Sequence, residues 1–442
     1  MTRRQNDDRY SLRITYHSME GKMFRRVEAW HYKCLKRIDV RLDPVNILIG
    51  PNASGKSTLL DLFSFLRDAL EGDVEEAVRR RTTSLRELVW NQTDEARGFE
   101  IAVEADIPQN LRTTNGYDRL RYEVGVGLDE VDGTIVVSGE NLWLVNSTQK
   151  PRPPSAQLTL FPRDLDDTRP VLHPARAKTP SGNRVVVRKV SPGGNDYFRS
   201  EQTGWNITFR LSPRRLALSG VPEDQDRFPI ALWFRQFLRQ DVQLLQLNSL
   251  LMRRPCPSDA PRTFQPDGSN LPLMVAELRT KSPKRFQWWI GHLQTILEDL
   301  EDITVAERPE DLSRYLVVTY RNGLPVPAWM LSDGTLRLLA LTLIAYLPRQ
   351  DRLFLVEEPE NGVHPRAVEA VFQPLTSVYE GQVFLATHST LFMALAQPEH
   401  LLVFGKTSSG ATDVVRGPDH PALQEWRKEV PLDTLFAAGV LG

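Results

Sequence analysis

Cysteine is scarce in this chain of 442 residues, which contains only Cys34 and Cys256. The two lie far apart without metal-ligand spacing, so they predict neither a disulfide framework nor a zinc site, and they fit a reducing cytoplasm. Long hydrophobic runs are also lacking. The longest, Leu336–Leu347, is interrupted by Arg337 and Thr342 and is shorter than the roughly 20 residues that span a bilayer. With no signal-peptide pattern at the polar N-terminus, we expect a cytoplasmic protein without a membrane partner.

An excess of charge of one sign is lacking as well. The chain has 55 Lys and Arg against 56 Asp and Glu, a formal net charge of −1. This balance excludes a polyanion-binding surface spread over the whole molecule. One stretch departs from it, because Lys150 to Arg215 holds 13 Lys and Arg against 5 Asp and Glu, a net charge of +8. Such a basic stretch fits either a DNA-facing patch or a solvated insertion that balances acidic surface elsewhere.

A glycine-rich loop gives the clearest chemical signal. It consists of Gly50, Pro51, Asn52, Ala53, Ser54, Gly55, Lys56, Ser57 and Thr58. A short apolar run of strand type precedes the loop and a helical pattern follows it, which is the context that a phosphate-binding loop requires. Glycines let successive backbone N–H groups point at one phosphate. The pattern predicts binding of a nucleoside triphosphate, with Lys56 on the β and γ phosphates and Ser57 as a ligand of Mg²⁺.

The hydrophobic periodicities predict alternating strands and helices after a loose N-terminal extension. Strands are expected at about 24–33, 36–42, 45–49, 99–105, 121–127, 133–137, 401–404 and 412–415. Helices are expected from Lys56 to about Glu71, at about 228–252 and 284–300, and at the C-terminal end. The second of these would carry the stripe Phe286, Ile290, Leu293, Leu297 and Leu300. Short β-like runs broken by Pro and Gly occupy about 140–225.

Two polar segments of the last third add candidate residues for phosphate and metal chemistry. The first reads L-S-D-G-T, and it offers Ser332 as a helix N-cap and Gly334 as a source of exposed N–H donors. A cap without a ligand would have the same pattern. The second is an apolar strand that ends in Glu357 and Glu358. Carboxylates at the end of a buried parallel strand suit a metal partner and a general base.

A third segment, Val383–Ser389, is another apolar strand with a polar end. Its His388 could hydrogen-bond a γ-phosphate or the attacking water, although a lone histidine at a strand end also fits a structural role.

Together these elements resemble the ABC-type ATPase heads of the SMC, RecF and OLD group. Gly50–Thr58 corresponds to the Walker A loop, Leu331–Thr335 to the signature loop, Leu353–Glu358 to Walker B and His388 to the switch histidine. The run Glu358–Pro365, with the sequence E-P-E-N-G-V-H-P, is similar to one found in RecF-like and OLD-like ATPases. The resemblance implies an α/β fold, a P-loop NTPase of ABC type with a mixed sheet core and a large inserted α+β region.

The same resemblance implies a division of the chain into four parts. These are an extension at 1–22, a first half of the ATPase core at 23–139, an insertion at 140–302 that is first basic and β-rich and then helical, and a second half of the core at 303–442.

Roles carried over from the family fall on matching positions of this chain. Lys56 and Ser57 would bind the phosphates and Mg²⁺, and Glu358 would be the catalytic base with His388 beside it. Glu357 stands where the family usually has Asp, so its metal-side carboxylate is one methylene longer. Asp333 replaces a glycine of the signature loop, whereas Ser332 and Gly334 remain.

Three further positions have weaker patterns. Gln92 fits the Q-loop glutamine that senses Mg²⁺, or a simple polar loop residue. Trp30 and Tyr32 are candidates for stacking on adenine, although aromatic residues on an early strand are usually core.

The family resemblance implies ATP hydrolysis in a head-to-tail homodimer, in which the signature loop of one copy contacts the γ-phosphate held by the other. Only 53 residues follow Ser389, fewer than the Toprim nuclease domain of OLD proteins needs, so we expect any nuclease or toxin effector on a separate chain. The leading interpretation is an ATPase of bacterial anti-phage defence that senses infection or DNA structure and controls this effector.

Alternatives stay open at this point. One is a RecF-like DNA repair ATPase. Another is the nucleotide-binding subunit of a transporter, which the E-P-E-N-G-V-H-P run and the long insertion disfavour. A third is an ATP-gated scaffold with little turnover.

Overall fold

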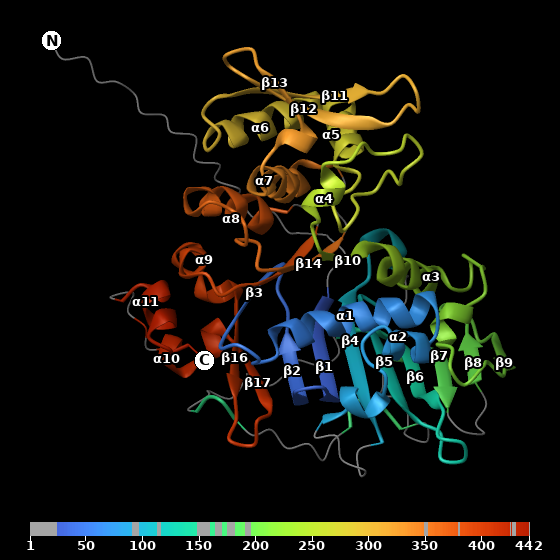
Figure 1. The fold of residues 1–442 in the computed structure, drawn as a ribbon. Helices are drawn as coiled ribbons and strands as arrows, with labels where there is room; N and C mark the ends of the chain where they lie inside the picture. Colours follow the sequence, from blue (N-terminus) through green and yellow to red (C-terminus); the bar gives the residue numbers. More distant parts are fainter. Residues whose placement is uncertain are drawn as a thin grey trace.

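The protein is described by a computed structural model that covers residues 24–90, 97–112, 116–147, 160–163, 170–174, 182–190, 196–348, 352–378, 381–424, 426 and 430–441. Within these ranges the strands form three sheets of eight, six and three strands (Figure 1). The predicted α/β fold class is confirmed. No helix of the described ranges is both long and apolar enough to cross a bilayer.

The eight-stranded sheet is antiparallel and has the order β2-β1-β4-β5-β6-β7-β8-β9. Its strands are β1 (Phe24–Tyr32), β2 (Leu35–Arg41), β4 (Gly98–Asp106), β5 (Arg119–Leu128), β6 (Ile135–Val145), β7 (Arg184–Val190), β8 (Asp196–Arg199) and β9 (Asn206–Phe209). Side chains alternate between the two faces of a strand, and one face of this sheet supplies the apolar side chains of a large buried cluster. The expected strands in the first 140 residues are confirmed.

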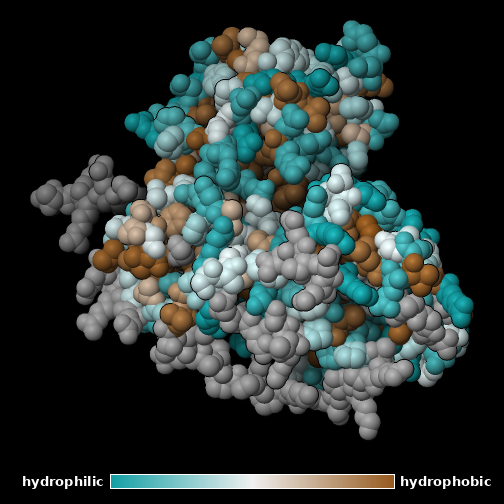
Figure 2. Space-filling view, turned by 60° about the horizontal axis from the view of Figure 1, so that its bottom comes forward, coloured by the Kyte–Doolittle hydropathy of each residue, from teal (hydrophilic) through white to brown (hydrophobic). Residues whose placement is uncertain are grey.

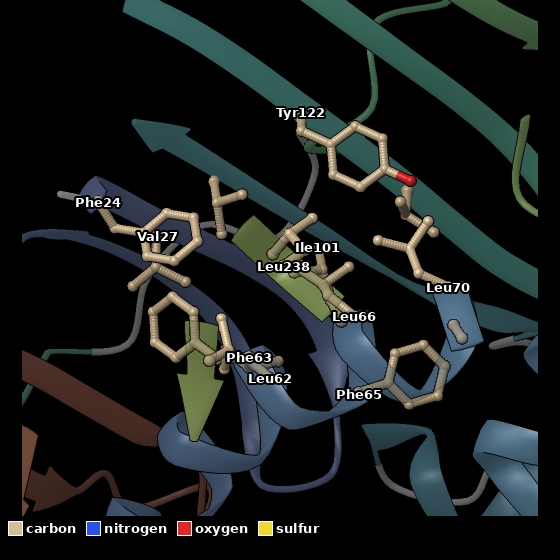
Figure 3. Close-up of a cluster of buried hydrophobic side chains, with 14 of the residues drawn as sticks. Phe24, Val27, Leu62, Phe63, Phe65, Leu66, Leu70, Ile101, Tyr122 and Leu238 are labelled. Atoms are coloured by element: carbon tan, nitrogen blue, oxygen red, sulfur yellow. The ribbon is translucent and has the colours of Figure 1, made fainter. Parts of the chain in front are cut away.

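The helix after the glycine-rich loop, α1 (Lys56–Glu71), joins this sheet to the next. The Phe63 ring lies 5.0 Å from that of Phe24 on β1 and 5.2 Å from that of Phe384 on β15. Figure 3 shows α1 side chains, with Leu62, Leu66 and Leu70 among them, against residues of the eight-stranded sheet. Each fully buried Leu or Phe contributes about 1.5–3 kcal/mol, so this packing fixes the position of the loop that begins α1.

The six-stranded sheet has the order β10-β14-β15-β3-β16-β17, and its first five strands are parallel. Only β17 runs antiparallel to its neighbour. The strands are β3 (Val45–Ile49), β10 (Val242–Leu245), β14 (Leu353–Glu357), β15 (Gln382–Ala386), β16 (Leu401–Lys406) and β17 (Thr412–Arg416). The carboxyl ends of the parallel strands meet at one edge, which is where α/β sheets bind their ligands.

A smaller lobe of helices and a three-stranded antiparallel sheet completes the molecule, at the top of Figure 1. The sheet contains β11 (Leu300–Glu307), β12 (Arg314–Tyr320) and β13 (Pro325–Pro327). The remaining helices are α2 (Val74–Arg79), α3 (Pro229–Gln236), α4 (Ser249–Met252), α5 (Leu271–Lys281), α6 (Pro283–Gln294), α7 (Asp333–Leu343), α8 (Val368–Thr376), α9 (Thr390–Leu395), α10 (Pro421–Gln424) and α11 (Leu432–Ala437). A second buried cluster joins this lobe to the six-stranded sheet. Outside the grey atoms, the face in Figure 2 shows hydrophobic groups scattered among hydrophilic residues.

Two expected helices are shorter than predicted. A single helix is expected at 228–252, but α3 ends at Gln236. One π-helical turn at Phe237–Asp241 follows, and then β10. The edge of β14 offers unpaired backbone groups, and pairing with them outweighs the local helical pattern of this stretch. The helix expected at 284–300 ends at Gln294, and Leu300 begins β11 instead of continuing the apolar stripe.

The predicted division into domains remains a prediction. β6 continues across residue 140 and β11 continues across residue 302, while β10, which belongs to the expected insertion, lies in the six-stranded sheet.

Candidate functional site

The glycine-rich loop follows the fully buried strand β3 and ends where α1 begins. Its backbone requires glycine at two points. Gly50 has φ +142°, and a Cβ there would lie 2.3 Å from the carbonyl oxygen of Phe404; Gly55 has φ +102°, and a Cβ there would lie 2.8 Å from Oγ1 of Thr412. Thr412 also donates its hydroxyl to the Ser54 carbonyl at 2.8 Å. The loop is therefore held against β16 and β17 in the shape that presents backbone N–H groups.

Lys56 is buried at the start of α1, with 6% of its surface exposed. Its Nζ donates to the carbonyl oxygens of Gly50 at 2.8 Å and Pro51 at 2.9 Å. Burial lowers the pKa of Lys56 to about 8, and the negative charge of Glu358 acts in the opposite direction. The next residue, Ser57, is exposed.

The acidic pair lies at the end of β14. The strand is buried up to Val356, and the carboxylates of Glu357 and Glu358 are exposed. Glu358 adopts φ +46°, a left-handed conformation that is uncommon for a residue with a Cβ. Its N–H donates to the Ala386 carbonyl at 2.8 Å, and Asn361 donates from Nδ2 to its carboxylate. These contacts hold the strained turn, which is typical of functional sites.

His388 lies just beyond β15, and its side chain is exposed. The carboxylate of Glu360 anchors this turn, because it accepts a hydrogen bond from the Thr387 hydroxyl at 2.6 Å and one from the His388 N–H at 3.3 Å. Partial burial lowers the pKa of His388, and the positive charge of Lys56 adds to this effect, whereas Glu358 and Glu360 oppose it.

The strand order explains why these residues meet. β14, β15 and β3 are adjacent and parallel, so Glu358, His388 and the glycine-rich loop emerge at the same edge. Lys56 begins α1 directly after the loop, so its ammonium group lies at this edge as well, and the negative charge of Glu358 acts to raise the pKa of both Lys56 and His388. Their individual roles remain predictions.

The signature loop, Leu331–Thr335, lies at the start of α7, beside the smaller lobe. Ser332 is exposed and caps α7, since its Oγ accepts the Thr335 N–H at 3.1 Å. Gly334 packs so closely on the E-P-E-N-G-V-H-P run that a Cβ there would lie 2.6 Å from the Gly362 carbonyl. The predicted N-cap is confirmed, and the phosphate-binding role of Ser332 and Gly334 stays a prediction.

The weaker candidates have different outcomes. Gln92 lies outside the described residues. The prediction for Tyr32 is wrong, because its ring is fully buried against Phe65 and Phe99 and its hydroxyl donates to Asp61 at 2.6 Å. Trp30 is half-buried and its ring stacks on that of His31 at 3.8 Å, so stacking on adenine stays a prediction.

The basic stretch contributes structural cations among the residues that the structure describes. Arg188 and Lys189 on β7 are buried; Arg188 donates to Asn141, and Lys189 donates at 2.6 Å to the carbonyls of Ser212 and Arg215. Arg184 donates to the Ser200 carbonyl. These three cations hold β7 to its surroundings.

Sequence reasoning missed two supporting residues. Glu360 belongs to the E-P-E-N-G-V-H-P run, which was the available signal. Thr412 supports the glycine-rich loop, but no sequence pattern marked it, because threonine is common in strands.

A nucleoside triphosphate with Mg²⁺ fits the residues present. The glycine geometry provides a phosphate cradle, while the Ser57 hydroxyl and the Glu357 carboxylate are hard oxygen donors of the kind that Mg²⁺ prefers. Among the described residues, no group of three or more His, Cys, Asp or Glu side chains could hold a metal by itself. Mg²⁺ is commonly held by one or two carboxylates together with the phosphates of the nucleotide.

The sheet order and the convergent loop, acids and histidine define a P-loop ATPase of the ABC type, similar to SMC and OLD proteins. Residues 45–394 match the family model described as "AAA domain, putative AbiEii toxin, Type IV TA system", and the chain belongs to this family.

Two individual proteins are similar to parts of the chain. An OLD nuclease of Thermus scotoductus is 30% identical over 93 residues, which are 21% of this chain and 16% of that protein. The crystal structure of an Smc head bound to the C-winged helix domain of ScpA aligns with a TM-score of 0.50 at 14% identity, covering 89% of this chain and 97% of that one. The second likeness concerns the fold alone.

Proposed function

We propose that the chain binds ATP with Mg²⁺ and hydrolyses it to ADP and phosphate. The convergence of Lys56, Glu358 and His388 at the glycine-rich loop supports this function most directly. The bond between the γ-phosphorus and the bridging oxygen breaks, and the oxygen of water bonds to that phosphorus. Glu358 accepts the proton of the water, while Lys56 neutralises charge on the β and γ phosphates.

The exposed side chains beside the loop have supporting roles in this proposal. Ser57 and Glu357 would hold Mg²⁺, which would neutralise phosphate charge. His388 hydrogen-bonds the γ-phosphate or the water, and Glu360 fixes its backbone. Gln92 is assigned a Mg²⁺-sensing role on the family resemblance only.

The proposed assembly is a head-to-tail homodimer. Ser332 is exposed at the start of α7, and the glycine-rich loop of the same chain lies in another part of the molecule, after β3. This position suits recognition of a phosphate held by a second copy. Loss of the γ-phosphate would remove contacts between the two copies, so ATP occupancy becomes a conformational signal.

The proposed role of this signal is control of a separately encoded effector, a nuclease or a toxin, in bacterial anti-phage defence. The names of the relatives, a nuclease and a toxin of a toxin–antitoxin system, support a link to such effectors. DNA remains a candidate signal. The buried Arg188 and Lys189 are unsuited to bind it, so other basic residues would have to do so.

ATP turnover by the purified chain, with and without duplex DNA, tests this function, and Lys56→Ala serves as the blank. Turnover above the blank is expected. Stimulation by DNA would make DNA the sensed signal, while turnover indifferent to DNA would direct the search to a protein partner. A wild-type rate equal to that of Lys56→Ala would contradict the proposal.

A further inference from the structure

A short segment of the basic stretch docks on the strand pair at one edge of the six-stranded sheet. Leu160–Arg163 lies against β16 and β17, which also hold the glycine-rich loop. The Phe161 ring is so close to β16 that a Cβ at Gly405 would lie 2.8 Å from it, and its centroid lies 5.0 Å from that of His420. This segment has no role in the proposed function.

Arg163 makes the polar contacts of the segment. The carboxylate of Asp413 on β17 is fully buried, and it accepts hydrogen bonds from the Arg163 backbone N–H at 2.8 Å, from Nε at 3.2 Å and from Nη2 at 3.3 Å. Within the described ranges, Arg163 is the cation that pairs with this carboxylate. A buried charge is costly without a partner, so removal of Arg163 would leave Asp413 uncompensated.

The same strand pair contacts the glycine-rich loop through the neighbouring residues. Gly405 and Asp413 are partners in the register of β16 and β17, and both contact the docked segment. The side chain of Thr412 points to the opposite side, because successive residues of a strand alternate, and its hydroxyl donates to a loop carbonyl at 2.8 Å. The Phe404 carbonyl lies 2.3 Å from the position of a Cβ at Gly50. The strand pair thus lies between the docked segment and the loop.

We propose that Arg163 and Asp413 are positioning residues for phosphate binding. Their ion pair holds β16 and β17 where Thr412 and Phe404 keep the glycine-rich loop in its phosphate-binding shape. Without the pair, β17 shifts to bring the Asp413 carboxylate to water, and Thr412 moves with it because the two residues are adjacent. This inference rests on the proposed ATP site and adds a link between that site and the basic stretch.

The effect of this link falls on ATP affinity and not on the chemical step. A shift of Thr412 removes one hydrogen bond from the empty loop, and restoring the shape of the loop then weakens ATP binding by about tenfold. At saturating ATP the phosphates themselves hold the loop. Glu358 and His388 follow β14 and β15 instead of β16 and β17, so their positions do not depend on the pair.

Binding and turnover measurements on variants of Arg163 test the proposal. Arg163→Ala should raise the Kd of a fluorescent ATP analogue about tenfold, while kcat at saturating ATP stays within about twofold. Arg163→Lys keeps the positive charge and should recover part of the affinity. Arg97→Ala is the matched control, because Arg97 pairs with Glu130 on the surface, and it should keep the wild-type Kd.

A merely structural role of Arg163 gives a different result. It would lower the fraction of folded protein and hence kcat, with an unchanged Kd for the protein that remains folded, and that outcome would overturn the proposal. Phe161→Ala takes the place of Arg163→Ala if the latter does not fold, because it removes the contact with Gly405 without leaving a buried charge. A rise in Kd is again expected, and an unchanged Kd would contradict the proposal.

A double-mutant cycle with Thr412 tests the route of the link. Thr412→Val lacks the hydroxyl that holds the loop, so adding Arg163→Ala to it should raise the Kd by less than in the wild type. Equal effects in both backgrounds would overturn the proposed route. Wild-type protein that binds no ATP would refute the proposed function itself, whereas wild-type binding together with an unchanged Kd of Arg163→Ala would refute only the positioning role.

Discussion

Lys56 shows at the scale of one residue how burial changes the charge of an ammonium group. The ammonium group is held by two backbone carbonyls of the loop that it is expected to serve. Because burial lowers its pKa to about 8, a large fraction of the free protein loses this charge in mildly alkaline solution.

ATP affinity should consequently fall as the pH rises above about 8. The phosphates bind the charged form, so the dissociation constant should increase by up to about tenfold per pH unit. Titrations with a fluorescent ATP analogue between pH 7 and 9.5 measure this change. Lys56→Arg stays charged throughout and should lack the inflection, whereas a flat wild-type profile would contradict the assignment.

Gly50→Ala should destabilise the folded chain. The new Cβ would meet the Phe404 carbonyl at 2.3 Å with φ at +142°, so the loop must shift at a cost of about 2 kcal/mol or more. Chemical denaturation gives the free energy of unfolding. Gly204 has open space around it, and Gly204→Ala should stay within about 0.5 kcal/mol of the wild type. Equal stability of the two variants would refute the close packing of the loop.

At the scale of elements, Glu201 fixes the start of α3. Its buried carboxylate accepts the N–H groups of Ile230 at 3.0 Å and Ala231 at 2.8 Å. Burial raises its pKa to about 7 in spite of these donors and of Arg184. The folded chain thus keeps a proton on Glu201 at pH values where the unfolded chain has lost it.

This difference predicts a pH dependence of stability. The contribution of Glu201 is complete below about pH 4.5, falls as the pH rises to about 7, and is constant above that. Glu201→Gln should remove this component. Unfolding free energies of both proteins at pH 5 and pH 7.5 test it, because other titrating groups affect both proteins alike. An identical pH slope in the variant would contradict the assignment.

The elements also show how far the sequence leads. The strands of the first 140 residues and α1 follow from local sequence patterns: β2 and β4 largely alternate between buried and more exposed positions, β3 is a short apolar run, and α1 has a helical apolar stripe. The acidic pair and His388 follow from polar residues at the ends of apolar strands. β10 could not be predicted, because its strand form depends on pairing with β14 far along the chain.

Side-chain environments were harder to predict than elements. Tyr32 was a candidate for stacking on adenine because its side chain is aromatic, but residues of α1 and β4 bury its ring. Lys189 contributed to a basic stretch in the sequence, yet its ammonium group donates hydrogen bonds to two backbone carbonyls inside the protein. Both outcomes depend on tertiary neighbours that no local pattern encodes.

For the whole molecule, the proposed dimer predicts an ATP-dependent change in mass. Glu358→Gln should bind ATP without hydrolysing it and elute as a dimer on size-exclusion chromatography with light scattering. Adding Ser332→Arg places a bulky side chain at the exposed cap of α7, and that double variant should remain a monomer. A Glu358→Gln protein that stays monomeric in saturating ATP would refute head-to-tail pairing.

The central claim is that Glu358 is the base of an ATP-hydrolysing site, and phosphate release at saturating ATP tests it most directly. We predict that Glu358→Gln lowers the rate by about 10²–10⁴-fold with little change in ATP affinity. Glu369→Gln, an exposed glutamate of α8, should keep the wild-type rate. A Glu358→Gln protein that releases phosphate as fast as the wild type would contradict the account.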